Sequence, residues 1–336
     1  MKQTNHQFRL GARPTGMPDR SDWDYTEEPV ADPADGELLV KVLYISLDPA
    51  MRGWMNDARS YIAPVGIGEV MRAIGVGQVI ATRHPRFAEG DCITGGVGVQ
   101  EYAILDGDGA VKVDPELAPL PVYLNTLGMP GMTAYFGLLD VGRPQPGETV
   151  VVSGAAGAVG ATVGQIAKLK GCHVVGIAGG AGKCRLILDE FGFDAAIDYK
   201  ADDVRAALKK SCPDRVHVYF DNVGGDILDA VLARLARGAR IALCGAVSQY
   251  NSEGGMRGPA NYMSLLVNRA SMTGFVVFDY ADRYGDAAHE MGGWMAEGKL
   301  KSREDIVAGL ETFPDTLLKL FRGENTGKLV LQVADA

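Results

Sequence analysis

Two hydrophobic patterns divide the chain. Residues 35–113 hold short stretches of alternating apolar and polar residues, such as 38–45 and 74–80, separated by Gly, Pro and Asp. That alternation is typical of β-strands joined by turns. Beyond about residue 128, short apolar runs alternate with segments of helical period. The second pattern predicts strands and helices in turn, as in a parallel sheet with both faces covered.

The strands and helices of the second region can be placed from this alternation. Strands are predicted at 149–153, 173–178, 195–198, 216–221, 240–244 and 272–278. Helices are predicted at 158–170, 183–191, 202–211, 226–236 and about 283–297. The tail then returns to a strand at 327–333, which we expect to rejoin the N-terminal β domain. The fold is therefore predicted to be α/β, with a doubly wound parallel sheet (128–298) inserted in a β-rich domain (1–127 plus 299–336).

The first βα turn of the predicted sheet carries a phosphate-binding pattern. The apolar run 149–153 leads into Gly154-Ala155-Ala156-Gly157-Ala158-Val159-Gly160, and a helix and a second strand follow. Backbone N–H groups at such a helix start point at an anion, and the missing side chains let it approach. Ala155 stands at the first glycine of G-x-G-x-x-G, so the context of strands and helix supports the motif. The alternative is a glycine-rich turn needed only for close packing.

The residues after the second strand favour a phosphorylated dinucleotide. A unit that prefers NAD places Asp or Glu roughly 20 residues after the first glycine, where it binds the ribose 2′-hydroxyl. Residues 177–185 hold no carboxylate and instead hold Lys183 and Arg185. A carboxylate would repel a 2′-phosphate, whereas these cations would neutralise one. The sequence therefore favours NADPH over NADH, and the alternative for Lys183 is an ordinary solvated lysine.

Composition and charge narrow the class of protein. A chain of 336 residues that is 47% hydrophobic and 22% charged is typical of a soluble globular protein with more than one domain. Its formal net charge of −9 argues against nucleic acid or an anionic membrane as a general partner. The start, 1–16, lacks the apolar core of a secretory signal, and the uncharged stretch 149–167 carries the phosphate motif. We therefore expect a cytoplasmic protein.

Cysteine usage indicates neither a disulfide framework nor a zinc site. The cysteines are odd in number, widely spaced and without a C-x-x-C pair. They are Cys92, Cys172, Cys184, Cys212 and Cys244. We expect most of them to be buried reduced thiols. Cys184, next to Lys183 at a predicted helix start, is the cysteine to test for reactivity.

Seven ordered blocks extend over nearly the whole chain. They are 46–49 with 51–53, 128–135, 155–160, 220–225, 244–250, 274–277 and 323–328. On these blocks the chain resembles the zinc-free medium-chain dehydrogenase/reductases, in the prostaglandin reductase, alkenal/one reductase and curcumin reductase branch. Zinc-dependent relatives carry a ligand cysteine near Ser46 and a four-cysteine lobe near residue 100, and neither is present here. The resemblance implies a Rossmann sheet inserted in a GroES-like catalytic domain, with NADPH as cofactor and no metal.

The resemblance also implies roles for individual residues. Gly157, Ala158, Val159 and Gly160 would hold the pyrophosphate, and Lys183 and Tyr199 the 2′-phosphate. The rest of the cofactor site would be lined by Thr133, Asn222, Cys244, Gly245, Ala246, Ser248, Tyr250, Phe275, Val276, Val277 and Asn325. The nicotinamide is expected in the cleft between the domains. A homodimer joined through the last strands, near 272–278, is implied as well.

The implied chemistry is reduction of a carbon–carbon double bond conjugated to the carbonyl of a small aldehyde or ketone. Hydride reaches the β-carbon and charge moves to the carbonyl oxygen, which needs a hydrogen-bond donor. Tyr61 and Tyr250 are the candidate catalytic residues. The cofactor's ribose hydroxyl is a further candidate donor and Tyr262 a weaker one, and each tyrosine has the alternative of a packed aromatic with a wet hydroxyl.

Two positions depart from the family pattern. Ala50 stands where members similar to curcumin reductase often have Tyr, and Val267 where prostaglandin reductases have one. The physiological substrate and the proton donor are therefore left open by the sequence. Reduction of quinones by NADPH is the rival enzyme function, and a dinucleotide-binding sensor or structural protein without turnover is the rival of another class.

Overall fold

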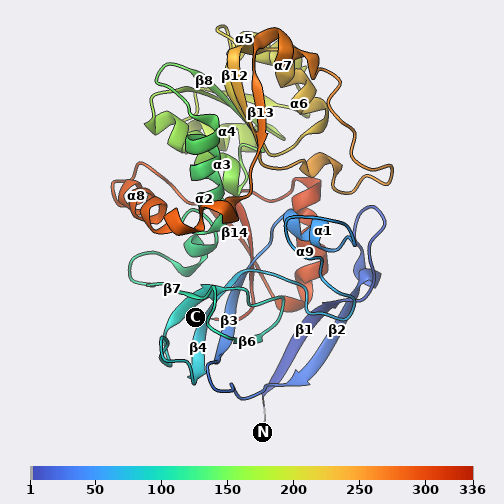
Figure 1. Cartoon of the computed structure of the whole chain (residues 1–336), viewed down its shortest axis with the longest axis vertical. Coiled ribbons are helices and arrows are strands. Elements are labelled where there is room, and N and C mark those ends of the chain that lie inside the picture. The colour runs from blue at the N-terminus through green and yellow to red at the C-terminus, as the bar shows by residue number, and fades with distance from the viewer. Residues whose placement is uncertain (1–2, 336) are drawn as a thin grey trace. The chain divides into compact units, whose positions relative to one another are not determined.

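The computed structural model describes residues 3–335, and their contacts divide the chain into two compact units (Figure 1). The first unit holds the chain up to Leu124 together with the residues from Glu304 onward. The second unit is Asn125–Arg303. The division lies a few residues from the boundaries expected from the sequence, which were 127/128 and 298/299. Each unit has its own sheet and its own hydrophobic core.

The second unit is built on a six-stranded sheet in which every neighbouring pair is parallel. Its strands are β8 (Thr149–Ser153), β9 (His173–Ala178), β10 (Ala195–Asp198), β11 (Val216–Asp221), β12 (Leu235–Leu243) and β13 (Ser271–Gly274). Their order is β10-β9-β8-β11-β12-β13, so the direction of winding reverses between β8 and β11. Open α/β sheets bind ligands at the carboxyl ends of the strands beside such a reversal. The predicted doubly wound parallel sheet is confirmed.

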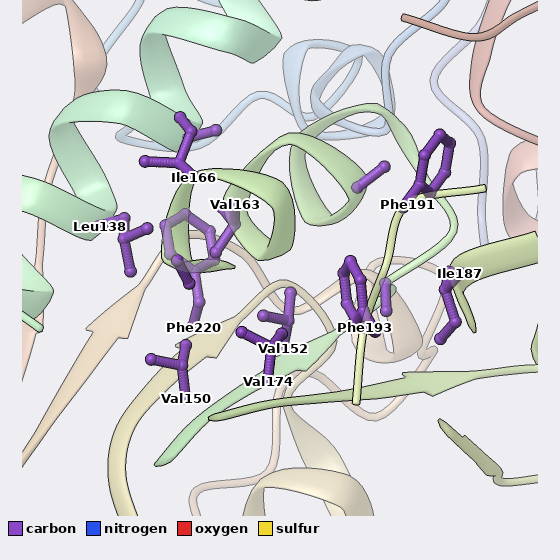
Figure 2. Close-up of a cluster of buried hydrophobic side chains, with 14 of the residues drawn as sticks. Leu138, Val150, Val152, Val163, Ile166, Val174, Ile187, Phe191, Phe193 and Phe220 are labelled. Carbon is purple, nitrogen blue, oxygen red and sulfur yellow. The ribbon is translucent and has the colours of Figure 1, made fainter. Parts of the chain in front are cut away.

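Helices cover both faces of this sheet. They are α2 (Met129–Phe136), α3 (Ala158–Leu169), α4 (Ala181–Asp189), α5 (Val204–Ser211), α6 (Gly225–Leu232), α7 (Met263–Asn268) and α8 (Tyr284–Ala296). Alternate residues of one strand face opposite helices: Val150 and Val152 pack in a cluster with α3, and Val151 packs in another with α5 and α6. Figure 2 shows the first cluster, with Val163 and Ile166 of α3 among its labelled side chains. Burial on both faces explains the continuous apolar strands in the sequence.

The first unit holds a mixed seven-stranded sheet and a separate hairpin of two strands. The hairpin is β1 (Thr4–Leu10) with β2 (Trp23–Pro29), and the sheet contains β3 (Leu38–Ser46), β4 (Gly75–Thr82), β5 (Cys92–Gly95), β6 (Tyr102–Leu105), β7 (Val111–Lys112), β14 (Glu304–Ala308) and β15 (Lys328–Gln332). Strand β3 pairs with β15, β4 and β6. Because β15 comes from the tail, the predicted return of the chain at 327–333 is confirmed.

Local sequence signals place the two helices of the first unit. Helix α1 (Ala50–Trp54) follows Pro49, and α9 (Phe313–Arg322) has Pro314 in its first turn. A proline at that position costs no hydrogen bond, because the first N–H groups of a helix have no partner within it. Helix α9 ends at Gly323, whose φ of 66° is the left-handed conformation that stops a helix.

Several predicted elements of the second unit have different bounds in the structure, and three of the differences change how the segment folds. The helix predicted at 226–236 ends at Leu232, and β12 begins at Leu235. Leu235 pairs with Val216, so pairing with β11 overrides the helical period of this segment. The strand predicted at 240–244 therefore starts earlier. The strand predicted at 272–278 ends at Gly274, and Val277–Arg283 form 3-10 turns.

Gly164 tests how closely α3 packs on the sheet. A Cβ at this position would overlap the buried ring of Phe193. We expect Gly164→Ala to lower the free energy of unfolding by about 1–3 kcal/mol, because the core has no room for the methyl group. Gly293 in α8 is the control, since a Cβ there would meet nothing within 4 Å. Gly293→Ala is expected to raise stability by up to about 1 kcal/mol in urea titrations, and an equal gain at Gly164 would contradict the packing argument.

Candidate functional site

The turn between β8 and α3 leaves room at the start of the helix. Gly157 is the N-cap residue, its backbone is extended, and no side chain caps this helix. A Cβ at Gly157 would meet only the carbonyl oxygen of Gly154, at 3.3 Å, whereas a Cβ at Gly160 would overlap that same oxygen. Gly160 therefore lets the helix begin directly against the turn. The partly exposed backbone of Ala158 and Val159 at this helix start fits an anionic group such as a pyrophosphate.

The turn between β9 and α4 is held by the end of the neighbouring strand β10. The Oδ1 atom of Asp198 accepts hydrogen bonds from the backbone N–H groups of Gly180 (2.7 Å) and Lys200 (3.0 Å). The ring of Tyr199 covers Gly179, where a Cβ would lie 2.8–2.9 Å from ring atoms and the phenol oxygen. Lys183 is the third residue of α4. The two residues predicted to bind a 2′-phosphate, Lys183 and Tyr199, are therefore brought to the same turn.

Asp198 is a residue of this turn that the sequence reasoning missed. That reasoning searched only 177–185 for a carboxylate, whereas Asp198 reaches the turn from the adjacent parallel strand, where it pairs with Ala178. The sequence did contain a signal for Asp198: it ends the predicted strand 195–198, and the carboxyl ends of parallel strands lie at the same edge of a sheet. Burial first, and then Asp198 and Asp202, raise the pKa of the Cys184 thiol. Cys184 therefore lacks the lowered pKa that marks reactive cysteines.

The loops after β11 and β12 are tied to each other and to β8. The Nδ2 atom of Asn222 donates to the carbonyl oxygen of Ser153 at 2.7 Å. The hydroxyl of Ser248 donates to the carbonyl oxygen of Val223 at 2.7 Å. Residues predicted for the cofactor from two separate blocks of sequence therefore lie together at the carboxyl edge of the sheet.

The loop that follows β12 folds back on its own tyrosine. The hydroxyl oxygen of Tyr250 accepts a hydrogen bond from the backbone N–H of Ala246 at 3.2 Å. Gly245 lies under this hydroxyl, since a Cβ there would be 2.8 Å from the phenol oxygen. Burial, with the nearby Asp221, raises the pKa of the Cys244 thiol to about 12. Cys244 is therefore a neutral thiol in this loop.

The remaining predicted cofactor residues of the second unit have packing partners of their own. The hydroxyl of Thr133 donates to the carbonyl one turn earlier in α2. The ring of Phe275 meets that of Phe220 edge-on, with centroids 6.1 Å apart. Val276 caps the 3-10 segment that begins at Val277. Contact of these side chains with a cofactor remains a prediction.

Tyr61, the other candidate catalytic residue, lies in the first unit on a loop with a closed base. The backbone N–H of Val65 donates to the carbonyl of Trp54 at 2.8 Å. The Nη1 atom of Arg13 donates to the carbonyls of both Met55 (2.6 Å) and Val65 (3.2 Å). Met55 and Val65 are buried, whereas Tyr61 is 56% exposed. The base of the loop is therefore fixed, and its tip presents the phenol.

Asn325 also belongs to the first unit. It is buried, and its Nδ2 atom donates to the carbonyl of Gly327 at 2.8 Å, just before β15. Of the two departures from the family pattern, Ala50 begins α1 in this unit, and Val267 lies exposed on α7 in the second unit. The roles of Asn325 and Tyr61 in binding and catalysis remain predictions.

No three His, Cys, Asp or Glu side chains of the described chain come together as a possible metal site. Among the same residues, no helix has both the length and the apolar character needed to cross a bilayer.

Comparison with known proteins decides the family. Residues 6–113 match a model of the N-terminal domain of oxidoreductases, and residues 158–291 match the zinc-binding dehydrogenase model. A putative NADP-dependent oxidoreductase of Bacillus subtilis, YfmJ, is 47% identical, with 100% of this chain and 99% of the relative covered. The NADPH-dependent curcumin reductase of Escherichia coli is 46% identical, covering 99% and 98%. The chain belongs to the curcumin, alkenal and prostaglandin reductase branch of the medium-chain dehydrogenase/reductases.

A solved structure of this branch agrees with the fold. CurA from Vibrio vulnificus in complex with NADPH superposes with a TM-score of 0.94 and is 46% identical, with 98% of this chain and 100% of that chain covered. The resemblance drawn from the seven sequence blocks is therefore confirmed, and so is the fold class. Membership of the branch does not by itself assign the roles of single residues in this chain.

Lys183 offers a direct test of the turn between β9 and α4. We expect Lys183→Ala to weaken NADPH binding by about 10–100-fold, because one charge-assisted bond to a phosphate is lost. NADH binding should be nearly unchanged, since NADH carries no 2′-phosphate. Lys210→Ala is the matched control. Lys210 lies in the last turn of α5, away from the carboxyl ends of the strands where the proposed site lies. Equal losses for both nucleotides in calorimetric titrations would contradict the assignment.

Proposed function

We propose that this protein is an NADPH-dependent reductase of carbon–carbon double bonds conjugated to the carbonyl of small aldehydes and ketones. The full-length likeness to a curcumin reductase carries the proposal. The uncapped turn after β8 and the gathering of Lys183 and Tyr199 around one turn support it, because both fit an anionic dinucleotide. In this proposal the backbone of 157–160 holds the pyrophosphate, and the loops after β11 and β12 hold the rest of the cofactor.

The protein's own groups have three tasks in this reaction. NADPH supplies the hydride that the β-carbon receives, and a proton reaches the α-carbon. Between these events negative charge lies on the carbonyl oxygen, where a fixed hydrogen-bond donor stabilises it. The chain must therefore bind the dinucleotide, hold the enone beside it, and offer that donor while it excludes water.

Tyr61 and Tyr250 are the proposed donors to the carbonyl oxygen. A hydrogen bond accepted by a phenol oxygen fixes the position of the hydroxyl group. The bond from the N–H of Ala246 orients the Tyr250 hydroxyl in this way. Tyr61 is presented by a loop whose base is held by Arg13, so its backbone costs little to order when substrate binds.

The substrate class and the two tyrosines can be tested together. We expect turnover of NADPH with a 2-alkenal and a linear enone, and a loss of about 10²-fold in kcat/KM for Tyr61→Phe or Tyr250→Phe, as for removal of one oxyanion donor. The dissociation constant of NADPH should stay within about threefold for Tyr61→Phe, since Tyr61 is proposed to bind the substrate and no hydrogen bond to the cofactor is removed. Tyr25→Phe is the control, since Tyr25 is an exposed tyrosine on β2 that no proposed site includes.

The two rival functions make different predictions in the same assay. Turnover with a quinone alone would rule out the proposed substrate class. Tight NADPH binding without oxidation by any conjugated carbonyl or quinone would favour a sensor or structural protein. If neither tyrosine variant changes turnover of the enone, the ribose hydroxyl of the cofactor and Tyr262 are the remaining candidate donors.

We propose further that the protein is a homodimer joined at β13. This strand ends the sheet and pairs with β12 alone among the described residues. Next to it, α7 exposes Met263, Leu266 and Val267, and Leu266 is 71% exposed. An open sheet edge beside apolar side chains favours association with another strand. Two copies of β13 paired about a two-fold axis would close both edges.

Leu266→Asp tests this interface. We expect the protein to run as a dimer in light scattering coupled to size exclusion, and the variant as a monomer, because the charge would be buried at the contact. Leu117→Asp is the control, since Leu117 is an exposed leucine of the first unit. A monomeric wild-type protein at micromolar concentration would contradict the proposal.

A further inference from the structure

Asp221, the last residue of β11, has a fully buried carboxyl group. Its Oδ1 atom accepts four hydrogen bonds. Two come from hydroxyls, those of Ser153 (3.1 Å) and Tyr219 (2.8 Å), and two from the backbone N–H groups of Val223 (3.0 Å) and Gly224 (2.9 Å). All these donors lie at the carboxyl edge of the parallel sheet or in the loop that leaves it.

The second oxygen of this carboxyl group lowers the stability of the fold. The Oδ2 atom of Asp221 is buried and has no hydrogen-bond partner among the described residues. Burial raises the pKa of this carboxyl, against the effect of the donors on Oδ1. A buried polar atom without a partner destabilises a fold, but an apolar side chain here would leave the four donors to Oδ1 without their acceptor. The carboxyl group is therefore tied to the loop and strand ends that supply those donors.

The hydrogen bonds of Asp221 connect the ends of three strands. Its carboxyl binds the hydroxyl of Ser153 at the end of β8, and that hydroxyl oxygen in turn accepts from the N–H of Asn222 at 3.0 Å. The carbonyl oxygen of Asp221 accepts from the N–H groups of Cys244 (2.9 Å) and Gly245 (3.0 Å), where β12 ends. One residue therefore sets the spacing of the loops that follow β8, β11 and β12.

We propose that Asp221 is a positioning residue for the dinucleotide. It holds the loop 222–225 and, through Ser153, the turn that begins at Gly154, so that both loops keep the separation that a bound cofactor requires. The inference rests on the proposed cofactor site. Asp221 acts through the backbone of these loops and does not itself contact the cofactor.

The position of Asp221 in the sheet predicts which part of the cofactor it affects. Its strand adjoins β8, whereas the turn with Lys183 and Tyr199 follows β9, on the other side of β8. The 2′-phosphate should therefore not sense the carboxyl group. Loss of the carboxyl should weaken NADPH and NADH equally, in contrast to loss of the Lys183 ammonium group.

The experiment compares two substitutions that differ in hydrogen bonding. Asp221→Leu removes the acceptor and keeps the branching at Cγ, and Asp221→Asn keeps one oxygen that can accept at the position of Oδ1. Titration of the purified protein with NADPH and with NADH should show both dissociation constants raised about 10-fold or more for Asp221→Leu, as for loss of hydrogen bonds to a charged group. For Asp221→Asn we expect both constants within about threefold of the wild type, because fewer bonds change.

A destabilised variant separates positioning from general support of the fold. Leu208→Ala, in the cluster on the α5 and α6 face, should lower the midpoint of thermal unfolding and leave both dissociation constants unchanged. If Asp221→Leu does not fold, Ser153→Ala cuts the link between the two loops, and the same equal weakening of both nucleotides is expected. Native affinity in the folded Leu or Ala variant would overturn the proposal. So would a loss confined to NADPH, or an Asn variant as weak as the Leu variant.

Titrations without substrate keep this test apart from the proposed function. A wild-type protein that binds neither nucleotide would refute the cofactor assignment itself. A wild-type protein that binds both but reduces no enone would refute the proposed reaction, and the comparison of Asp221 variants would still decide the positioning role.

Discussion

The close approach of α3 to the turn after β8 is the constraint on which the candidate site depends. A methyl group at Gly160 would overlap the carbonyl oxygen of Gly154, so only glycine lets the helix begin against the turn. The helix dipole and the free ends of its first N–H groups then lie at the carboxyl edge of the sheet, beside the point where the winding reverses. The packing of α3 against Val150 and Val152 of β8 holds the start of the helix at this edge.

Acidic side chains at this edge bind mainly to the backbone of the protein itself. Asp198 accepts from one backbone N–H in the turn after β9 and from one just after its own strand, and Asp221 accepts from two in the loop after β11. Peptide dipoles thereby offset the carboxyl charge locally. The charges of Asp198 and Asp202 still raise the pKa of Cys184 in α4, so in a chain of net charge −9 the proposed 2′-phosphate would depend on the cations of α4. The same bonds give the loops a fixed shape before any ligand binds.

A few elements show which parts of the structure could be predicted from the sequence. Strands β8 and β9 have the predicted bounds, because β-branched runs buried on both faces have no competing helical interpretation. The helical period predicts a helix that ends at residue 236, but β12 already begins at Leu235 because β11 offers that segment a partner. Asn222 was predicted as a cofactor residue from the block 220–225. The sequence offered no sign that the neighbouring Asp221 accepts hydrogen bonds from several loops, because an Asp at this position is also common in plain turns.

The sequence by itself determined the order of strands and helices along the chain, the family and the glycine-rich turn before α3, because these depend on local periodicity, on glycines at fixed spacing and on motifs that extend along the chain. Tertiary structure decided which distant residues share an edge: Asp198 with Gly180, Tyr199 with Gly179, and Asp221 with Ser153. The physical reason is that a parallel sheet aligns the ends of strands far apart in sequence, and neither periodicity nor spacing encodes the contacts made there.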